Sequence, residues 1–173
     1  HYVAACRLSA EDVPELIDIA KTWLEYWPEE DDGEVARNIV DAELLPVTAW
    51  RALADLRADE AVEPLIEVAR AMSEEEDDWA WEELPHVFGK IGENAVDPLA
   101  RVVRDPAEAD YTRSIAARGL RYVADRCPRV RDRVVGCLTE VMADASAGHL
   151  EFNSLLLVEL VELRAVEAAE AIE

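Results

Sequence analysis

The sequence is short of the residues that usually carry chemistry or cross-links. Its 173 residues include three cysteines, three histidines and only two lysines beside fifteen arginines. Cys6, Cys127 and Cys137 show no CxxC spacing, so neither a disulfide framework nor a zinc knuckle is predicted, and a reducing cytoplasm is expected. No hydroxyl–histidine–acid set and no glycine-rich phosphate loop occurs. We therefore expect no catalytic residues, no metal and no cofactor.

Glycine, positive charge and long apolar runs are also scarce. Six glycines in a chain that is 51% hydrophobic argue against a disordered polypeptide. No stretch approaches the roughly 20 apolar residues of a membrane span, and no signal-peptide pattern begins the chain. A formal net charge of −22 disfavours binding to nucleic acid or to an anionic membrane, because both require positive charge. The acidity fits solubility, a salt-rich habitat or an acidic docking surface.

What the chain does contain is a ten-residue phrase that occurs twice. Residues 60–69 read EAVEPLIEVA, and residues 94–103 read NAVDPLARVV. Alanine, valine, proline, leucine and a second valine recur at matched positions 34 residues apart. A fixed period of this size is typical of stacked helix pairs, each of which buries its apolar side against its neighbours. The phrase therefore predicts the fold better than the function.

Apolar spacing is helical almost everywhere, and no strand alternation or long linker interrupts it. We predict one all-α domain, an α–α superhelix of about nine or ten helices in antiparallel pairs. Ser9 is a favourable N-cap with Asp12 three residues later. After a helix over 34–44, Pro46 starts or kinks the next one, which ends near Arg57. The approximate units span 1–45, 46–73, 77–105, 107–144 and 149–173.

The two phrases and the segments before them resemble the HEAT-like repeats named after phycobilisome lyases. The typical unit of that family reads like ALxxLGxxxAVxPLxxxL. It is matched by residues 52–56 leading into 61–65, and by residues 87–92 leading into 95–99. The resemblance is strong over about 47–104. It implies an α-solenoid with outer and inner helices, and most proteins with such repeats are interaction scaffolds. The metal hydroxylase among related folds uses repeated His-Glu pairs, which this chain lacks.

Each helix that contains the repeated phrase carries a polar stripe beside its apolar stripe, since positions three to four residues apart share a helix face. In the repeat class that the sequence resembles, the second helix of each pair usually lines the concave surface. Stacked units would then align Glu63, Asp97 and Asp132 in an acidic row bordered by arginines. We interpret this row as a groove that meets a partner; the alternative is an ordinary solvated face. The candidate partner-binding residues are Glu60, Glu63, Glu67, Arg70, Asp97, Arg101, Arg104, Arg129, Asp132 and Arg133.

Arginine is concentrated in residues 101–133, which hold nine arginines and five acids. One interpretation is a local basic patch that binds an acidic peptide or a phosphate, because arginine suits both. The alternatives are pairing with the acidic neighbouring repeats and head-to-tail self-association. The sequence leaves these readings open.

Trp79 and Trp81 cannot face the same way on one helix. Trp81 lines up with Leu84 and Phe88, which predicts a core position. Trp79 lines up with Glu83 and other polar residues, which predicts an exposed or half-exposed position. Exposed tryptophan anchors many interfaces, although it also occurs as a partly covered rim residue. Trp79 therefore joins the candidate partner-binding residues.

Taken together, these features favour a non-enzymatic scaffold that binds another protein or peptide along the concave surface of an acidic solenoid. Self-association is possible, and neither a nucleic acid nor a membrane is an expected partner. The family name suggests a second reading, a lyase-like or chaperone-like factor for a cofactor-bearing protein. A third reading is a DNA-repair glycosylase on a HEAT-like fold. That class needs a basic groove, which the net charge of −22 opposes.

Overall fold

The computed structural model describes residues 2–22, 35–73, 78–144 and 149–169. These residues form helices and short 3-10 turns and contain no strand, so the predicted all-α class is confirmed for this part of the chain. The α-helices are α1 (Tyr2–Cys6), α2 (Val13–Lys21), α3 (Val35–Leu56), α4 (Val62–Ala71), α5 (Asp78–Ile91), α6 (Val96–Arg104), α7 (Asp110–Arg126), α8 (Arg131–Ala143) and α9 (Leu150–Glu162). The 3-10 turns are η1 (Ala10–Asp12), η3 (Asp59–Ala61), η4 (Glu93–Ala95), η5 (Pro128–Val130) and η7 (Val166–Ala168).

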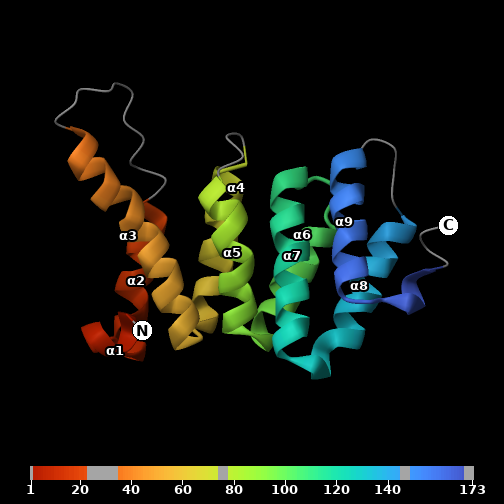
Figure 1. Ribbon diagram of the computed structural model, residues 1–173, viewed down its shortest axis with the longest axis horizontal. Coiled ribbons are helices and arrows are strands. Elements are labelled where there is room, and N and C mark those ends of the chain that lie inside the picture. Colours follow the sequence, from red (N-terminus) through yellow and green to blue (C-terminus); the bar gives the residue numbers. More distant parts are fainter. Residues whose placement is uncertain (1, 23–34, 74–77, 145–148, 170–173) are drawn as a thin grey trace.

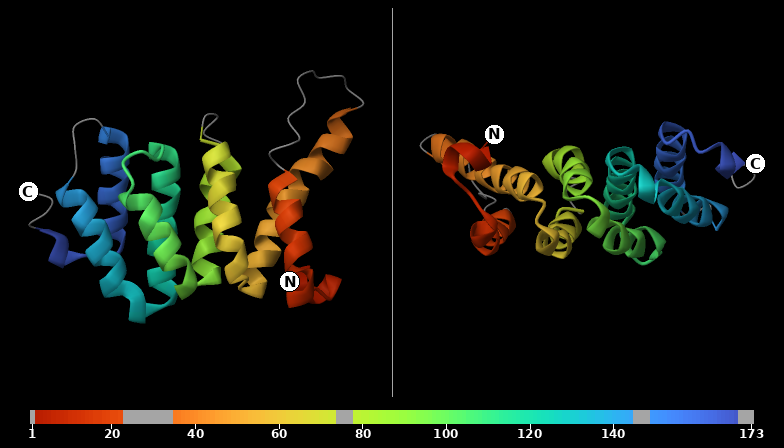
Figure 2. Two further views of the ribbon diagram at one scale, coloured as in Figure 1. Left: turned by 180° about the vertical axis from the view of Figure 1, so that it is seen from behind. Right: turned by 90° about the horizontal axis from the view of Figure 1, so that it is seen from below.

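The helices lie in two layers that follow chain order along the long axis of the molecule (Figures 1 and 2). Helices α1, α3, α5, α7 and α9 contact one another in this order and form the first layer. Helices α2, α4, α6 and α8 do the same in the second layer. Each second-layer helix also contacts the first-layer helix that follows it in the chain. Helices that are distant in the chain are therefore connected mainly through the helices that lie between them.

A single apolar core runs through both layers from Val13 to Ala168. The repeated phrase supplies its centre, because Leu65 and Leu99 are fully buried and Val134 of α8 takes the matching place. Trp50 of α3 is also fully buried, and its indole N–H donates to the carbonyl of Ala20 at 3.1 Å. The core positions predicted from the phrase are thus confirmed.

Among the described residues, the corners from the first layer to the second are built in the same way, with the 3-10 turns η1, η3, η4 and η5 leading into α2, α4, α6 and α8. The last residue of the turn is a small, buried apolar side chain in η3, η4, η5 and η7. At the first corner the predicted capping box is confirmed. The backbone N–H of Ser9 donates to Asp12 Oδ2 at 2.7 Å, and Ser9 Oγ accepts from the N–H of Glu11 at 3.3 Å. This cap satisfies N–H groups that have no partner inside the helix.

The prediction that a separate helix starts at Pro46 is wrong, because α3 runs from Val35 to Leu56 without interruption. Proline inside a helix loses one hydrogen bond and costs about 3 kcal/mol. Here the cost is offset by packing, since α2 and α5 cover the helix and bury Pro46, Val47 and Leu53. The predicted extension of the first long helix to Tyr26, and the packing of Trp23 and Trp27, lie outside the described residues.

Helices α5 and α7 approach each other closely at Gly89. A Cβ atom at this position would lie 2.6 Å from the Cβ of Tyr122 and 3.2 Å from its carbonyl carbon. No side chain fits into that space without moving a helix. The central contact of the first layer therefore depends on a glycine.

Three arginines adopt positive φ where first-layer helices end. Arg7, Arg57 and Arg164 have φ of 56°, 54° and 52°. At each of these ends the following residue donates its N–H back into the helix, as Ala58 does to the carbonyl of Leu53 at 3.0 Å. This is the Schellman arrangement, in which glycine is the usual residue. A left-handed arginine costs roughly 1–2 kcal/mol, so these corners hold backbone strain.

The strain at Arg57 predicts that glycine is the better residue there. We expect Arg57→Gly to unfold with a free energy about 1 kcal/mol higher than that of Arg57→Ala, because both variants lose the guanidinium and only alanine keeps the left-handed strain. Urea unfolding followed by circular dichroism measures the difference. Equal stability of the two variants would show that the corner is unstrained.

Candidate functional site

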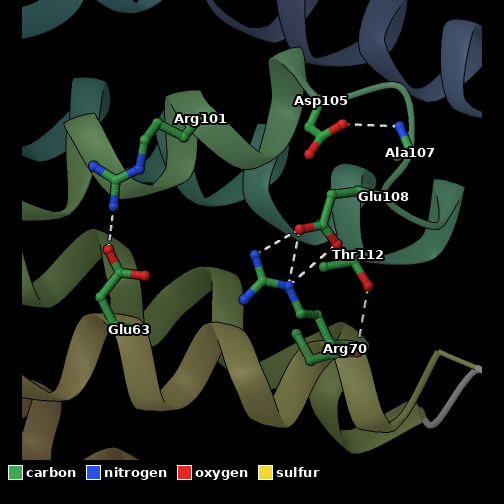
Figure 3. Close-up of polar contacts among 8 residues, drawn as sticks. Glu63, Arg70, Arg101, Asp105, Ala107, Glu108 and Thr112 are labelled. Atoms are coloured by element: carbon green, nitrogen blue, oxygen red, sulfur yellow. Dashed lines mark hydrogen bonds and ion pairs between the residues drawn. The ribbon is translucent and has the colours of Figure 1, made fainter.

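The second-layer helices α4, α6 and α8 leave one face in solvent, and most of the candidate partner-binding residues lie on it. In Figure 3, α4 and α6 run side by side with this face toward the viewer. Glu63 of α4 is 56% exposed and Arg101 of α6 is 67% exposed. Because the apolar residues of these helices point into the core, the polar stripe is free to face outward.

Acids and arginines from neighbouring units pair along this face. Glu63 forms an ion pair with Arg101 (Figure 3), and Asp97 forms one with Arg133 of α8. The sequence predicts a row of acids here, whereas the structure interleaves the acids with arginines. Each pair joins one unit to the next at a sequence separation of 38 or 36 residues.

The last-turn arginines of α4 and α6 make a second set of cross-unit pairs. Arg70 reaches Glu108, with a closest distance of 2.5 Å (Figure 3), and Arg104 reaches Glu140 at 2.9 Å. The hydrogen bonds that Arg70 donates to Glu108 are the largest cause that raises the pKa of Arg70. Glu108 and Glu140 were not singled out by the sequence reasoning. Opposite charges that recur about one repeat period apart are the signal that would have found them.

The remaining acids of the face are less engaged. Glu67 contacts Lys21 of α2 at 3.3 Å. Glu60 is exposed on η3, and Asp132 is almost fully exposed beside Arg131, at 3.7 Å. Arg129 lies elsewhere, on the corner turn η5, where it pairs with Glu93. The structure thus brings most of the predicted residues to one face and places Arg129 on the edge.

Cross-unit pairs also join the first layer, where they are more buried. Arg51 of α3 pairs with Glu83 of α5, and hydrogen bonds from Arg51 hold the pKa of Glu83 below its ordinary value of 4.5. Arg121 of α7 pairs with Glu159 of α9, and their side chains are only 13% and 8% exposed. Burial raises the pKa of Glu159, while Arg121 pulls it the other way. Removing one partner of such a pair leaves a buried charge unmatched.

Two arginines donate hydrogen bonds to carbonyl groups at the C-terminal ends of neighbouring helices. Arg113 is buried beneath the ring of Phe152, 3.9 Å from its centroid, and donates two hydrogen bonds to the carbonyl of Val103 near the end of α6. Arg131 donates to the carbonyl of Leu163 at 2.9 Å. These carbonyls belong to the last turns of helices, where partners inside the helix are missing. Both arginines therefore have structural roles.

The basic segment 101–133 is largely occupied by contacts within the chain. Seven of its nine arginines form ion pairs with acids of the chain. An eighth, Arg118, lies 5.6 Å from the ring centroid of Trp81. Of the alternatives open at the sequence level, pairing with the acidic neighbouring repeats accounts for most of this segment. The contiguous basic groove that a DNA-repair glycosylase needs is not formed by these side chains. The ninth arginine, Arg126, forms no ion pair with an acid of the described residues.

The two tryptophans of α5 have different environments. Trp79 is 40% exposed, as the helical spacing predicts. Trp81 is partly buried and packs on Tyr111 of α7, with ring centroids 5.8 Å apart. Trp79 thus lies at the start of a first-layer helix, away from the acid–arginine face of the second layer.

Two kinds of site are absent from the part of the chain that the structure describes. It contains no group of three or more histidine, cysteine, aspartate or glutamate side chains arranged to hold a metal ion. His149 pairs with Asp110 at 2.7 Å, without a third metal-binding side chain beside them. Among the described helices, none combines the length and the apolar character needed to cross a bilayer.

Comparison with known proteins gives no family. No family model matches the sequence, and neither a curated protein nor a solved structure matches the chain.

Two arginine–glutamate pairs differ in burial, and this difference predicts very different contributions to the free energy of unfolding. We expect Arg101→Met, which breaks the exposed pair with Glu63, to lower the free energy of unfolding by less than about 1 kcal/mol. Arg121→Met leaves Glu159 buried without its partner and should cost about 3 kcal/mol or more. Urea unfolding of both variants at pH 7 tests this. Equal losses would contradict the assignment of one pair to the surface and the other to the interior.

The lowered pKa of Glu83 predicts a pH dependence with a definite sign. A carboxyl whose folded pKa lies below its unfolded value stabilises the fold above about pH 4.5, and this stability is lost as pH falls through the folded pKa. Wild type should exceed Glu83→Gln in unfolding free energy by about 0.5 kcal/mol at pH 7, and the difference should shrink in acid.

Unfolding curves from pH 7 down to about pH 3.5 measure this difference. The control is Glu82→Gln, which removes an exposed carboxyl from the same helix and reports the general effect of net charge. If Glu82→Gln and Glu83→Gln followed the same pH dependence, the pair with Arg51 would not be the cause.

Proposed function

We propose that the chain is a HEAT-like α-solenoid that acts as a non-enzymatic scaffold and binds another protein or peptide through the solvent-facing side of α4, α6 and α8. The observation that carries the proposal is the row of exposed acid–arginine pairs on this face. Cross-unit pairing holds these charges at fixed places along consecutive helices. A regularly charged surface of this kind suits recognition of an extended partner.

The weakness of exposed pairs supports the same reading. An exposed ion pair contributes about 0–1 kcal/mol, so charged groups of a partner can replace one member at little cost. The net charge of −22 favours a basic partner, because it speeds the encounter of oppositely charged molecules. Asp132, which is almost fully exposed, offers a carboxylate that contacts only Arg131 among the described basic groups.

Affinity capture from the native cell tests the proposal, with the double variant Glu63→Lys, Asp97→Lys as bait beside wild type. We expect partners bound by wild type at low salt to be lost by this variant, because its charge reversal places like charges beside Arg101 and Arg133 of the chain and beside a basic partner. The matched control is Glu151→Lys, Glu162→Lys, which makes the same charge change on the exposed side of α9.

Circular dichroism of all three baits verifies that each is folded. Retention of the same proteins by the wild-type and the Glu63→Lys, Asp97→Lys baits would contradict binding through this face. Loss of the partners from both double variants would point to net charge alone and would contradict it equally. Size-exclusion chromatography at two protein concentrations separates self-association from binding of a different protein.

A further inference from the structure

A polar cavity of about 750 Å³ opens on the edge of the molecule where the first layer turns into the second. It spans three successive corners, at 57–59, 92–94 and 126–129, which lie along the lower edge of Figure 1. This edge is separate from the acid–arginine face proposed above to bind a protein. The charged residues that line the cavity are Arg57, Lys90, Arg126, Arg129, Asp55, Asp59 and Glu93.

Each of the three acids in this cavity already has a partner. Asp55 pairs with Lys90 at 2.8 Å, and Glu93 pairs with Arg129. Asp59 accepts a hydrogen bond from the amide of Asn94.

Arg57 and Arg126 are different, since neither forms an ion pair with an acid of the described chain. The lining is formally +1, within a chain of −22. The other two cations of the lining, Lys90 and Arg129, are each paired with an acid. Arg57 and Arg126 therefore line the cavity without an acidic partner among the described residues.

Arg57 also has an unfavourable backbone conformation, one in which glycine is the usual residue. Its φ of 54° is left-handed, and the next corner places Gly92 at a φ of 101° directly after α5. An arginine in this conformation costs roughly 1–2 kcal/mol. Arg7 and Arg164 share this conformation at other helix ends, so what sets Arg57 apart is that its side chain lines the cavity.

We propose that this corner cavity binds a phosphate-class anion that carries more than one charged group, such as a diphosphate. Guanidinium groups form paired, charge-assisted hydrogen bonds with phosphate oxygens. Arg57 and Arg126 lie on corners two helix spacings apart, about 16–20 Å at the usual interaxial distance. Lys90 lies near the corner between them, and Arg129 lies on the same corner as Arg126. A ligand that meets both arginines is therefore extended, and a single phosphate satisfies only one of them.

Titration with inorganic pyrophosphate, without divalent cations and in about 0.15 M salt, tests the site while screening the repulsion from the rest of the chain. We expect saturable binding by calorimetry, with shifts of arginine Nε–H signals in the NMR spectrum. The variant Arg57→Gly, Arg126→Gln should bind about tenfold more weakly for each arginine removed. Glycine should relieve the strain at position 57, and circular dichroism verifies that the double variant is folded.

The matched control is Arg7→Gly, which removes a left-handed arginine from the preceding corner, outside the cavity. It should bind pyrophosphate as wild type does. Absence of saturable binding at about 10 mM pyrophosphate, or equal weakening by Arg7→Gly, would overturn the proposal. Orthophosphate that bound as tightly as pyrophosphate would overturn the two-arginine arrangement.

Discussion

Apolar side chains of one helix pair are covered only where the next pair lies over them, and this packing sets the register of the whole molecule. Leu65, Leu99 and Val134 occupy matching places in consecutive second-layer helices and are completely buried. Burying one such side chain contributes roughly 1.5–3 kcal/mol, whereas an exposed ion pair contributes about 0–1 kcal/mol. The core therefore decides how units stack, and the charges adjust to the register that the core imposes.

That register explains why most of the ion pairs between neighbouring units join residues 32 to 39 positions apart. A charge on one unit meets the next unit at the offset of one repeat, so an acid pairs with an arginine that is remote in sequence. The same side chains then have two roles. They brace neighbouring units, and they form the charged surface that we propose for partner binding. The buried pair of Arg121 and Glu159 serves only the first role, because solvent scarcely reaches it.

The sequence was sufficient for the features that depend on local pattern. Apolar spacing identified the helices, the phrase identified the core, and Ser9 identified a cap, since each is encoded within about ten residues. It failed at Pro46, because the burial of α3 between two neighbours offsets a local cost that sequence alone cannot weigh. It also missed Glu108 and Glu140, whose pairing depends on which residues of one unit lie beside the arginines of the unit before it. The left-handed corners had a visible signal, because Leu56-Arg57-Ala58 recurs as Leu163-Arg164-Ala165.

Gly89 has a geometric meaning beyond its own contact. Each unit is built on the one before it, so a tilt between α5 and α7 is carried by everything that follows residue 110. A side chain at position 89 would have to displace the backbone of Tyr122, which is 3.2 Å from the place its Cβ would occupy. The contact between α5 and α7 therefore sets the orientation of all the helices that follow α5. One methyl group there would move the far end by much more than its own width, and it would change the spacing between charges at the two ends.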